Sequence, residues 1–344
     1  MECATLPHQK SVHVLGSQGW VSRGKVSCGR APAVPYQTPP ARLPHGARRP
    51  ALRADGPACG AGVASSGSAG HGSGPTVTLN NGVKMPMLAF AANMYGPDVC
   101  RRATAHALTA GFRNIWSSEI IGDGCQRAQR EAMDASGLAR SELFVAGTVM
   151  NPQCTASDCY QTTMSQARNQ LEMLSSDNTL DMLMLDYPSS AGCDGIEGQW
   201  KALEELYRAG NVRVIAVSNF RDEHLTCIAR NNSATLPAVN QMNYNTGNAD
   251  RSVLQSNEKF GITVQAYSPL GSGGVLQSPK LHSIAKKHGK TPAQVALRWL
   301  TQQGVAVALA STSLEHLKQD VDISSINLSK EDMRELGSSG SEPM

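Results

Sequence analysis

Eight short apolar runs, separated by longer segments in which apolar residues recur at helical spacing, constrain the fold of this chain more than any other feature. Each run suits a strand of a parallel sheet that is buried on both faces. The runs lie at residues 87–92, 113–116, 143–148, 180–186, 212–219, 238–242, 263–269 and 305–311.

The helical segments lie at residues 98–110, 126–136, 157–174, 196–209, 222–231, 250–260 and 280–303, with one more at 314–321. Strands that alternate with helices in this way predict an α/β fold. The eight runs and their crossovers, over about 250 residues, favour a closed (β/α)8 TIM barrel. An open, doubly wound sheet is the alternative. Ahead of the first strand, residues 76–79 alternate, Asn80-Asn81-Gly82 is a turn signal and residues 83–85 resume the pattern, which predicts an N-terminal β-hairpin.

The first 74 residues differ in composition from the rest. They carry eight basic and two acidic side chains, a net charge of +6, whereas residues 75–344 carry 23 basic and 26 acidic side chains, a net charge of −3. Because segment 1–74 has neither alternating nor helical periodicity, we expect a disordered leader. It lacks a continuous apolar core, contains Arg and Ser and is poor in acids, which fits an organellar transit peptide. Its prolines would break an amphipathic targeting helix, so we expect a plastid location, with mitochondrion or cytoplasm as alternatives.

Charge, apolar runs and cysteine spacing narrow the classes of partner. Residues 75–344 are mildly acidic, so we expect no nucleic-acid partner, and no apolar run is long enough to cross a bilayer. The nine cysteines lack paired short spacings and are predicted to be reduced thiols of an intracellular protein. Cys154 and Cys159 have no second Cys or His pair nearby, so we expect no metal site.

A barrel places its functional residues at the carboxyl ends of its strands. No Gly-x-Gly-x-x-Gly lies between the first predicted strand and helix, and Gly271 to Gly274 come too late for a dinucleotide fingerprint. A nucleotide would therefore bind in another way. The residues at the predicted strand ends are Trp116, Thr148, Asp186, Ser218, Asn219, Gln241 and Tyr267.

Six segments carry a resemblance to a known family. They are LNNGVKMP at 79–86, GFRNI at 111–115, GNVRVIAVSNF at 210–220, VNQ at 239–241, AYSPLG at 266–271 and TPAQVALRW at 291–299. In their order and spacing, residues 76 to 337 resemble an aldo-keto reductase. The resemblance implies a barrel, NADPH as cofactor and hydride transfer to an aldehyde or ketone without a metal. It also implies a catalytic tetrad: a Tyr acid whose pKa a Lys–Asp pair lowers, and a His that orients the carbonyl.

This sequence departs from the family pattern at all four tetrad positions. Trp116 stands at the Asp position, Ile121 at the Tyr, Thr148 at the Lys and Asp186 at the His. We therefore predict a degenerate family member that is impaired or inactive in carbonyl reduction. Two alternatives to the missing catalytic acid remain open. Tyr187 or Tyr95 could supply a phenol. Alternatively, Asp186 could pair with Glu119 as carboxylates in the pocket, although solvated acids at the rim of a cleft are the plainer interpretation of these two residues.

At the cofactor-binding positions, this sequence matches the family pattern better than at the tetrad positions. The resemblance assigns Ser218, Asn219 and Gln241 to the nicotinamide carboxamide and Tyr267 to stacking on the ring, although hydrogen bonds among themselves would also explain these residues. Ser268 and Leu270 match the loop over the pyrophosphate, where backbone N–H groups can bind anions. At the adenosine end the matching residues are Ser311, His316 and Asp320, and the usual Lys and Arg are replaced by Ala310 and His316. Fewer cations predict weakened NADP(H) binding.

Three functions follow as hypotheses. The first is a catalytically silent family member that retains a nicotinamide nucleotide, as ligand or sensor. The second is an NADP-dependent oxidoreductase of aldehydes or ketones with a rearranged proton donor, and the third a non-enzymatic scaffold. We expect a monomer, and the sequence identifies no small carbonyl ligand.

Overall fold

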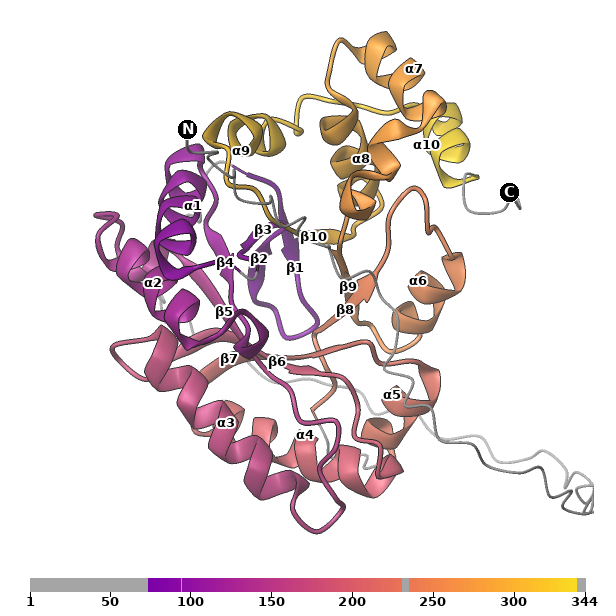
Figure 1. Ribbon diagram of the computed structural model, residues 1–344. Coiled ribbons are helices and arrows are strands. Elements are labelled where there is room, and N and C mark those ends of the chain that lie inside the picture. The colour runs from indigo at the N-terminus through magenta and orange to yellow at the C-terminus, as the bar shows by residue number, and fades with distance from the viewer. Residues whose placement is uncertain (1–73, 94, 231–234, 339–344) are drawn as a thin grey trace, which may run out of the picture. The chain divides into compact units, whose positions relative to one another are not determined.

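The computed structural model describes residues 74–93, 95–230 and 235–338. The predicted leader lies outside these residues as far as position 73, and its boundary and its targeting role stay predictions. Eight parallel strands form a closed barrel in which the last strand pairs with the first (Figure 1). They are β3 (Leu88–Ala91), β4 (Asn114–Trp116), β5 (Phe144–Val149), β6 (Leu180–Asp186), β7 (Val212–Ser218), β8 (Val239–Asn243), β9 (Thr263–Tyr267) and β10 (Ala306–Leu309).

Helices follow the strands and lie outside the ring (Figure 1). They are α1 (Pro97–Ala110), α2 (Asp123–Asp134), α3 (Cys159–Leu174), α4 (Gly192–Arg208), α5 (Asp222–Ala229), α6 (Arg251–Glu258), α7 (Pro279–His288), α8 (Pro292–Thr301), α9 (Leu314–Val321) and α10 (Lys330–Gly337). The predicted (β/α)8 barrel is confirmed, and each predicted strand overlaps an observed one. None of the described helices combines the length and the apolar character that a bilayer crossing requires.

The prediction of one helix over residues 280–303 is wrong, because the structure has two. α7 ends at His288 and is capped by Gly289, whose φ of 61° favours glycine. α8 then begins after Thr291, whose hydroxyl accepts a hydrogen bond from Gln294 N, with Pro292 in the first turn. The short helix α10 was not predicted.

The N-terminal hairpin is confirmed and helps to fill the barrel. β1 (Thr76–Thr78) and β2 (Lys84–Pro86) pair antiparallel. Leu79, Met85 and Met87 belong to the same buried cluster as Phe144 and Met182 from the strands. The turn is anchored by Asn80 Nδ2, which donates to Pro237 O at 2.9 Å. Strand side chains of the opposite parity pack against the helices in a second, larger cluster.

The prediction of reduced thiols is wrong for the described residues. All six cysteines in this part of the chain are paired in disulfides: Cys100–Cys125, Cys154–Cys159 and Cys193–Cys227. The first and third pairs are 25 and 34 residues apart, so their proximity comes from the packing of neighbouring helices and leaves no short spacing in the sequence.

Candidate functional site

The carboxyl ends of β6 to β9 bring the predicted cofactor residues together. In the parallel register, Asp186 lies beside Ser218 and Ser218 beside Gln241. On the next pair of strands, Asn243 lies beside Tyr267. The sheet therefore sets these side chains on neighbouring strand ends at the mouth of the barrel.

Hydrogen bonds join most of this group into one network. Asn219 Nδ2 donates to Asp186 Oδ1 and to Ser218 Oγ, each at 3.0 Å. The Tyr267 hydroxyl donates to Asn219 Oδ1 at 3.2 Å. Gln241 joins this group through its main-chain oxygen, which accepts from Asn219 N at 2.9 Å. Its side chain has another partner, because Nε2 donates to Gln265 Oε1 at 2.8 Å. The residues that the resemblance assigns to the nicotinamide are thus also partners of one another.

Three non-glycine residues next to these strand ends adopt the left-handed conformation. They are Tyr187 after β6, with φ 62°, Asn219 after β7, with φ 62°, and Ser268 after β9, with φ 49°. Such a conformation costs on the order of 1–3 kcal/mol per residue and persists where the surroundings impose it. Strain of this kind gathers at binding and active sites, which supports this corner as the functional one.

The electrostatics of the corner oppose proton donation by a phenol. Burial raises the pKa of Asp186, although hydrogen bonds from Ser218 and Asn219 act against the rise. Burial also raises the pKa of Tyr187, and the charge of Asp186 adds to the effect. The pKa of Tyr267 is raised by burial and by Tyr187 and Asp186. Both phenols are weaker acids than free tyrosine, whereas the tetrad chemistry requires a stronger one.

The other tetrad positions also lie at the mouth, without a proton donor of that kind. Thr148 is fully buried in β5, and its hydroxyl donates to Ser118 Oγ at 2.6 Å. Ile121 is buried in the short helix η1 (Glu119–Ile121). Trp116 ends β4, and its indole Nε1 is buried without a hydrogen-bond partner. An orphaned donor at the mouth suits a ligand that brings an acceptor.

The sequence suggests two alternatives to the missing acid, a pair of carboxyl groups and a tyrosine at another position. Glu119 Oε2 accepts from Gln166 Nε2 at 3.4 Å, and its pKa is raised by burial. Its partners are thus distinct from those of Asp186, and the two carboxyl groups do not form a pair. The phenol of Tyr187 does lie near Asp186, but with the raised pKa described above. Burial likewise raises the pKa of Tyr95.

The loop after β9 is shaped for close packing. Ser268 is exposed and Leu270 half-buried, and the short helix η3 (Gly271–Gly273) follows. Gly271 has a φ of 55°, and a Cβ there would lie 2.5 Å from Val275 Cγ2, so only glycine fits. The N–H groups of Gly271 and Gly273 donate to Ser268 O and Leu270 O. Those two donors are occupied within the loop, which leaves fewer N–H groups for a phosphate than we expected.

The predicted adenosine end is poor in positive charge. Ser311 Oγ accepts from Ser313 N at 3.1 Å, and His316 is exposed on α9. Asp320, on the same helix, is only 5% exposed, and burial raises its pKa to about 7. A buried acid beside a phosphate is unfavourable once it ionises.

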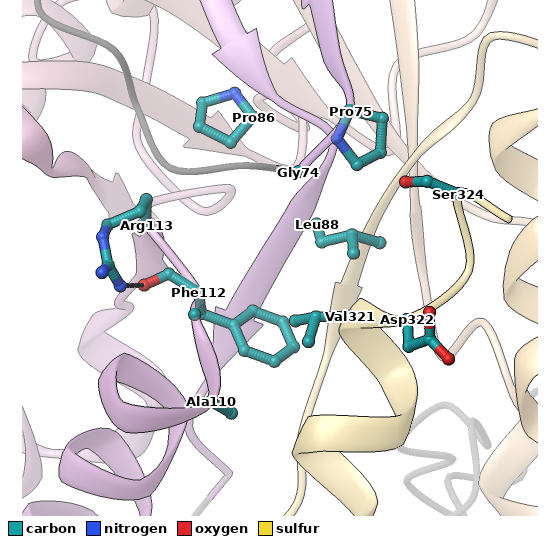
Figure 2. A pocket seen from close by; sticks show the side chains of 11 residues that line it. Gly74, Pro75, Pro86, Leu88, Ala110, Phe112, Arg113, Val321, Asp322 and Ser324 are labelled. Atoms are coloured by element: carbon teal, nitrogen blue, oxygen red, sulfur yellow. Dashed lines mark hydrogen bonds between the residues drawn. The ribbon is translucent and has the colours of Figure 1, made fainter.

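A cavity of about 320 Å³ lies at the opposite end of the barrel, among residues that precede β3 and β4 and follow α9 (Figure 2). Its charged groups are already paired. Arg113 donates to Phe112 O and Leu108 O, as Figure 2 shows for Phe112, and Asp322 accepts from Lys290. The cavity therefore offers no unpaired charged group among the described residues, and the mouth remains the candidate site.

The geometry at Asn219 predicts a measurable backbone strain. Asn219→Ala loses the side-chain hydrogen bonds and keeps an unfavourable φ, whereas Asn219→Gly loses only the hydrogen bonds. We expect the alanine variant to be less stable than the glycine variant by about 1–2 kcal/mol, as measured by urea unfolding. The same two substitutions at Asn178, which has a φ of 59° and lies outside the site, are the matched control. Equal stabilities of Asn219→Ala and Asn219→Gly would contradict the strain.

The pKa of Asp320 predicts a pH-dependent stability. Because the folded-state pKa of about 7 exceeds the unfolded value of about 3.9, the folded chain holds a proton that the unfolded chain releases. This contribution to stability is full below about pH 4 and is lost as the pH rises through 7. Asp320→Asn should therefore match wild type near pH 4 and exceed it at pH 8 by on the order of 2–4 kcal/mol.

Urea unfolding at the two pH values checks this expectation, with exposed Asp194→Asn as control. A variant no more stable than wild type at pH 8 would show that Asp320 is not held protonated.

Comparison with known proteins agrees with the fold and the motifs. The sequence model of the aldo/keto reductase family matches residues 95–340. Glyoxal reductase of Bacillus subtilis is 33% identical over 264 residues, which cover 76% of this chain and 91% of the relative. The aldo/keto reductase of Brucella melitensis is 29% identical, with a TM-score of 0.70 over 77% of this chain and 98% of that one. A Gox0644 variant in complex with NADPH is 26% identical, with a TM-score of 0.70 over 78% and 94% of the two chains. The chain belongs to the aldo/keto reductase family.

Proposed function

We propose that this family member binds NADP(H) at the corner formed by β7 to β9 and does not reduce carbonyls at ordinary enzyme rates. The observation that carries the proposal is the inverted acidity at the mouth. The phenols of Tyr187 and Tyr267 lie close to Asp186 and have raised pKa values, while Ile121 occupies the family's acid position. An alkoxide that develops in hydride transfer would have no competent phenol to protonate it.

The residues at the corner fit the nicotinamide end of the cofactor. Ser218, Asn219 and Gln241 combine a hydroxyl with two amides, which can pair with both the oxygen and the nitrogen of a carboxamide. Tyr267 offers a half-buried ring for stacking. When bound, the cofactor supplies a hydride. The solved NADPH complex of a related protein supports the choice of nucleotide.

Binding would exchange hydrogen bonds at this corner. Asn219 can pair with a carboxamide only by giving up or sharing its bonds to Asp186, Ser218 or Tyr267. Asp186 would then accept from fewer donors in a buried place, which costs free energy. Together with the loss of cations at Ala310 and His316, this exchange supports an affinity below that of a typical family member.

A second candidate function rests on Asp186 itself. Burial raises its pKa, and a carboxylic acid kept protonated at the mouth could donate a proton in place of the missing phenol. Its substrate would be a small carbonyl compound, as the name of the Bacillus subtilis relative suggests. Glyoxal-dependent oxidation of NADPH that disappears in Asp186→Asn would favour this candidate over the silent one.

We further propose that segment 1–74 directs the protein to the plastid and that the remainder acts as a monomer. Uptake of the full chain by isolated plastids, with removal of this segment, tests the first. Sedimentation velocity tests the second.

Nucleotide binding should depend on the Tyr267 ring. We expect calorimetric titration of the full chain with NADPH to show saturable binding, and Tyr267→Ala to weaken it by about tenfold through lost ring contact. Tyr267→Phe keeps the ring and should bind close to wild type. Tyr160→Ala, which removes a half-buried ring of α3 that contacts α4, is the control for the loss of a ring outside the site.

Equal affinities of wild type and Tyr267→Ala would place the nucleotide elsewhere. No binding of NADPH or NADH by the wild-type chain would remove both nucleotide-dependent functions and leave a scaffold.

A further inference from the structure

The three disulfides lie in the loops and helices that follow five consecutive strands of the barrel. Cys100 and Cys125 join the first turns of α1 and α2. Cys154 and Cys159 close the loop between β5 and α3. Cys193 and Cys227 join α4 to α5. The loops and helices that follow the strands from β3 to β7 therefore carry a covalent link, and the loops after β6 and β7 begin at the candidate site.

The Cys193–Cys227 link has the most direct relation to the site. One linked segment leaves β6 at Asp186, and the other leaves β7 at Ser218 and Asn219. The disulfide therefore ties together the two segments whose starting points are joined by the hydrogen bond from Asn219 to Asp186. Because the two cysteines are 34 residues apart, the link holds a long stretch of chain closed.

The loop between β6 and α4 is held tightly on its other side. Ser189 packs directly against Gly195 of α4, where a Cβ would overlap Ser189 Oγ. This close contact leaves the loop little room to rearrange. The same oxygen donates to Cys154 O at 3.1 Å and lies 3.4 Å from Cys159 Sγ. Movement of this loop on reduction would thus be transmitted to Tyr187 and Asp186 at its start.

The disulfides differ in access to a reductant. Cys100 and Cys125 are 0% and 2% exposed, so an attacking thiol cannot reach them in the folded protein. Cys193 is half-buried and lies in the first turn of α4. Its partner Cys227 is only 6% exposed, so an attacking thiolate reaches the disulfide at the sulfur of Cys193, and Cys227 is the leaving group. Cys154 is also half-buried, but its link closes a loop within one segment and ties no two segments together.

We propose that Cys193–Cys227 is a reversible thiol–disulfide site whose reduction by a dithiol loosens the β6–α4 and β7–α5 segments and weakens nucleotide binding at the mouth. The effect on the nucleotide rests on the function proposed above, whereas the exchange chemistry does not.

The exchange is a balanced two-electron step. A thiolate of the dithiol attacks Cys193 Sγ, the bond between the two sulfurs breaks, and Cys227 leaves as a thiolate that takes a proton. The second thiol of the reductant then attacks the mixed disulfide. The products are two cysteine thiols and an oxidised, cyclic reductant, so two electrons and two protons pass to the protein.

The first experiment maps the exchange without any nucleotide. The oxidised full-length chain is treated with dithiothreitol under native conditions, alkylated and digested, and each cysteine is assigned by mass spectrometry. We expect Cys193 and Cys227 to be alkylated while Cys100 and Cys125 stay linked. Absence of a 193–227 link before reduction, or its survival beyond that of 100–125, overturns the proposal.

The second experiment measures the consequence. Reduction should weaken NADPH binding at least about fivefold, the low end of coupling between sites. The Cys193→Ser/Cys227→Ser double variant should have the weaker affinity in both redox states. Cys100→Ser/Cys125→Ser should keep the redox response, and Cys154→Ser/Cys159→Ser tests whether the neighbouring link contributes. Equal affinity of the oxidised and reduced wild-type chain overturns the proposed coupling.

Hydrogen–deuterium exchange separates this proposal from the function on which it rests. Residues 187–191 and 219–221 should exchange faster after reduction, whether or not a nucleotide binds. Faster exchange without any NADPH binding would contradict the proposed function and leave the thiol–disulfide site standing. Unchanged exchange in both segments would overturn the thiol–disulfide proposal itself.

Discussion

The pairing of β10 with β3 closes the sheet, and the rest of the structure depends on that closure. A closed parallel barrel has no exposed edge, so every strand finds two partners and all eight carboxyl ends meet around one mouth. The buried interior of Met, Ala and Phe side chains and the hairpin below it complete the core. Residues far apart in the chain, such as Asp186 and Tyr267, come near one another because β6 to β9 follow one another around this ring.

The acidity of the two phenols at the mouth depends on the charge of the group beside them. A tyrosine becomes a useful acid when a nearby cation stabilises its phenolate. Here Asp186 lies near Tyr187 and Tyr267, and burial together with the carboxylate raises the pKa of both. At the same strand ends, Ser218, Asn219 and Gln241 keep the uncharged polar groups that suit a carboxamide. Under the proposed function, the corner therefore binds the nucleotide but lacks a phenol that could protonate the alkoxide.

The sequence predicts the fold well because the signals are local. Apolar runs mark each buried strand, and Asn80-Asn81-Gly82 marks the hairpin turn. The break between α7 and α8 also has a local signal, namely Gly289 and Thr291 followed by Pro292. The prediction missed it because helical periodicity continues on both sides. The disulfides could not be predicted from local signals, because Cys193 and Cys227 come together only when α4 packs beside α5. The same holds for the Asp186–Asn219–Tyr267 hydrogen bonds, which depend on strand register.

The measurement that tests the account most directly is the fluorescence of NADPH bound to the full chain, followed after addition of excess glyoxal. The account predicts that the enhanced emission of the bound nucleotide persists, because the nucleotide is held but the alkoxide would find no proton donor. Emission that decays at a rate proportional to protein concentration would show turnover and contradict the silent site. A chain that never enhances the emission, with no binding by calorimetry, would contradict the retained nucleotide corner.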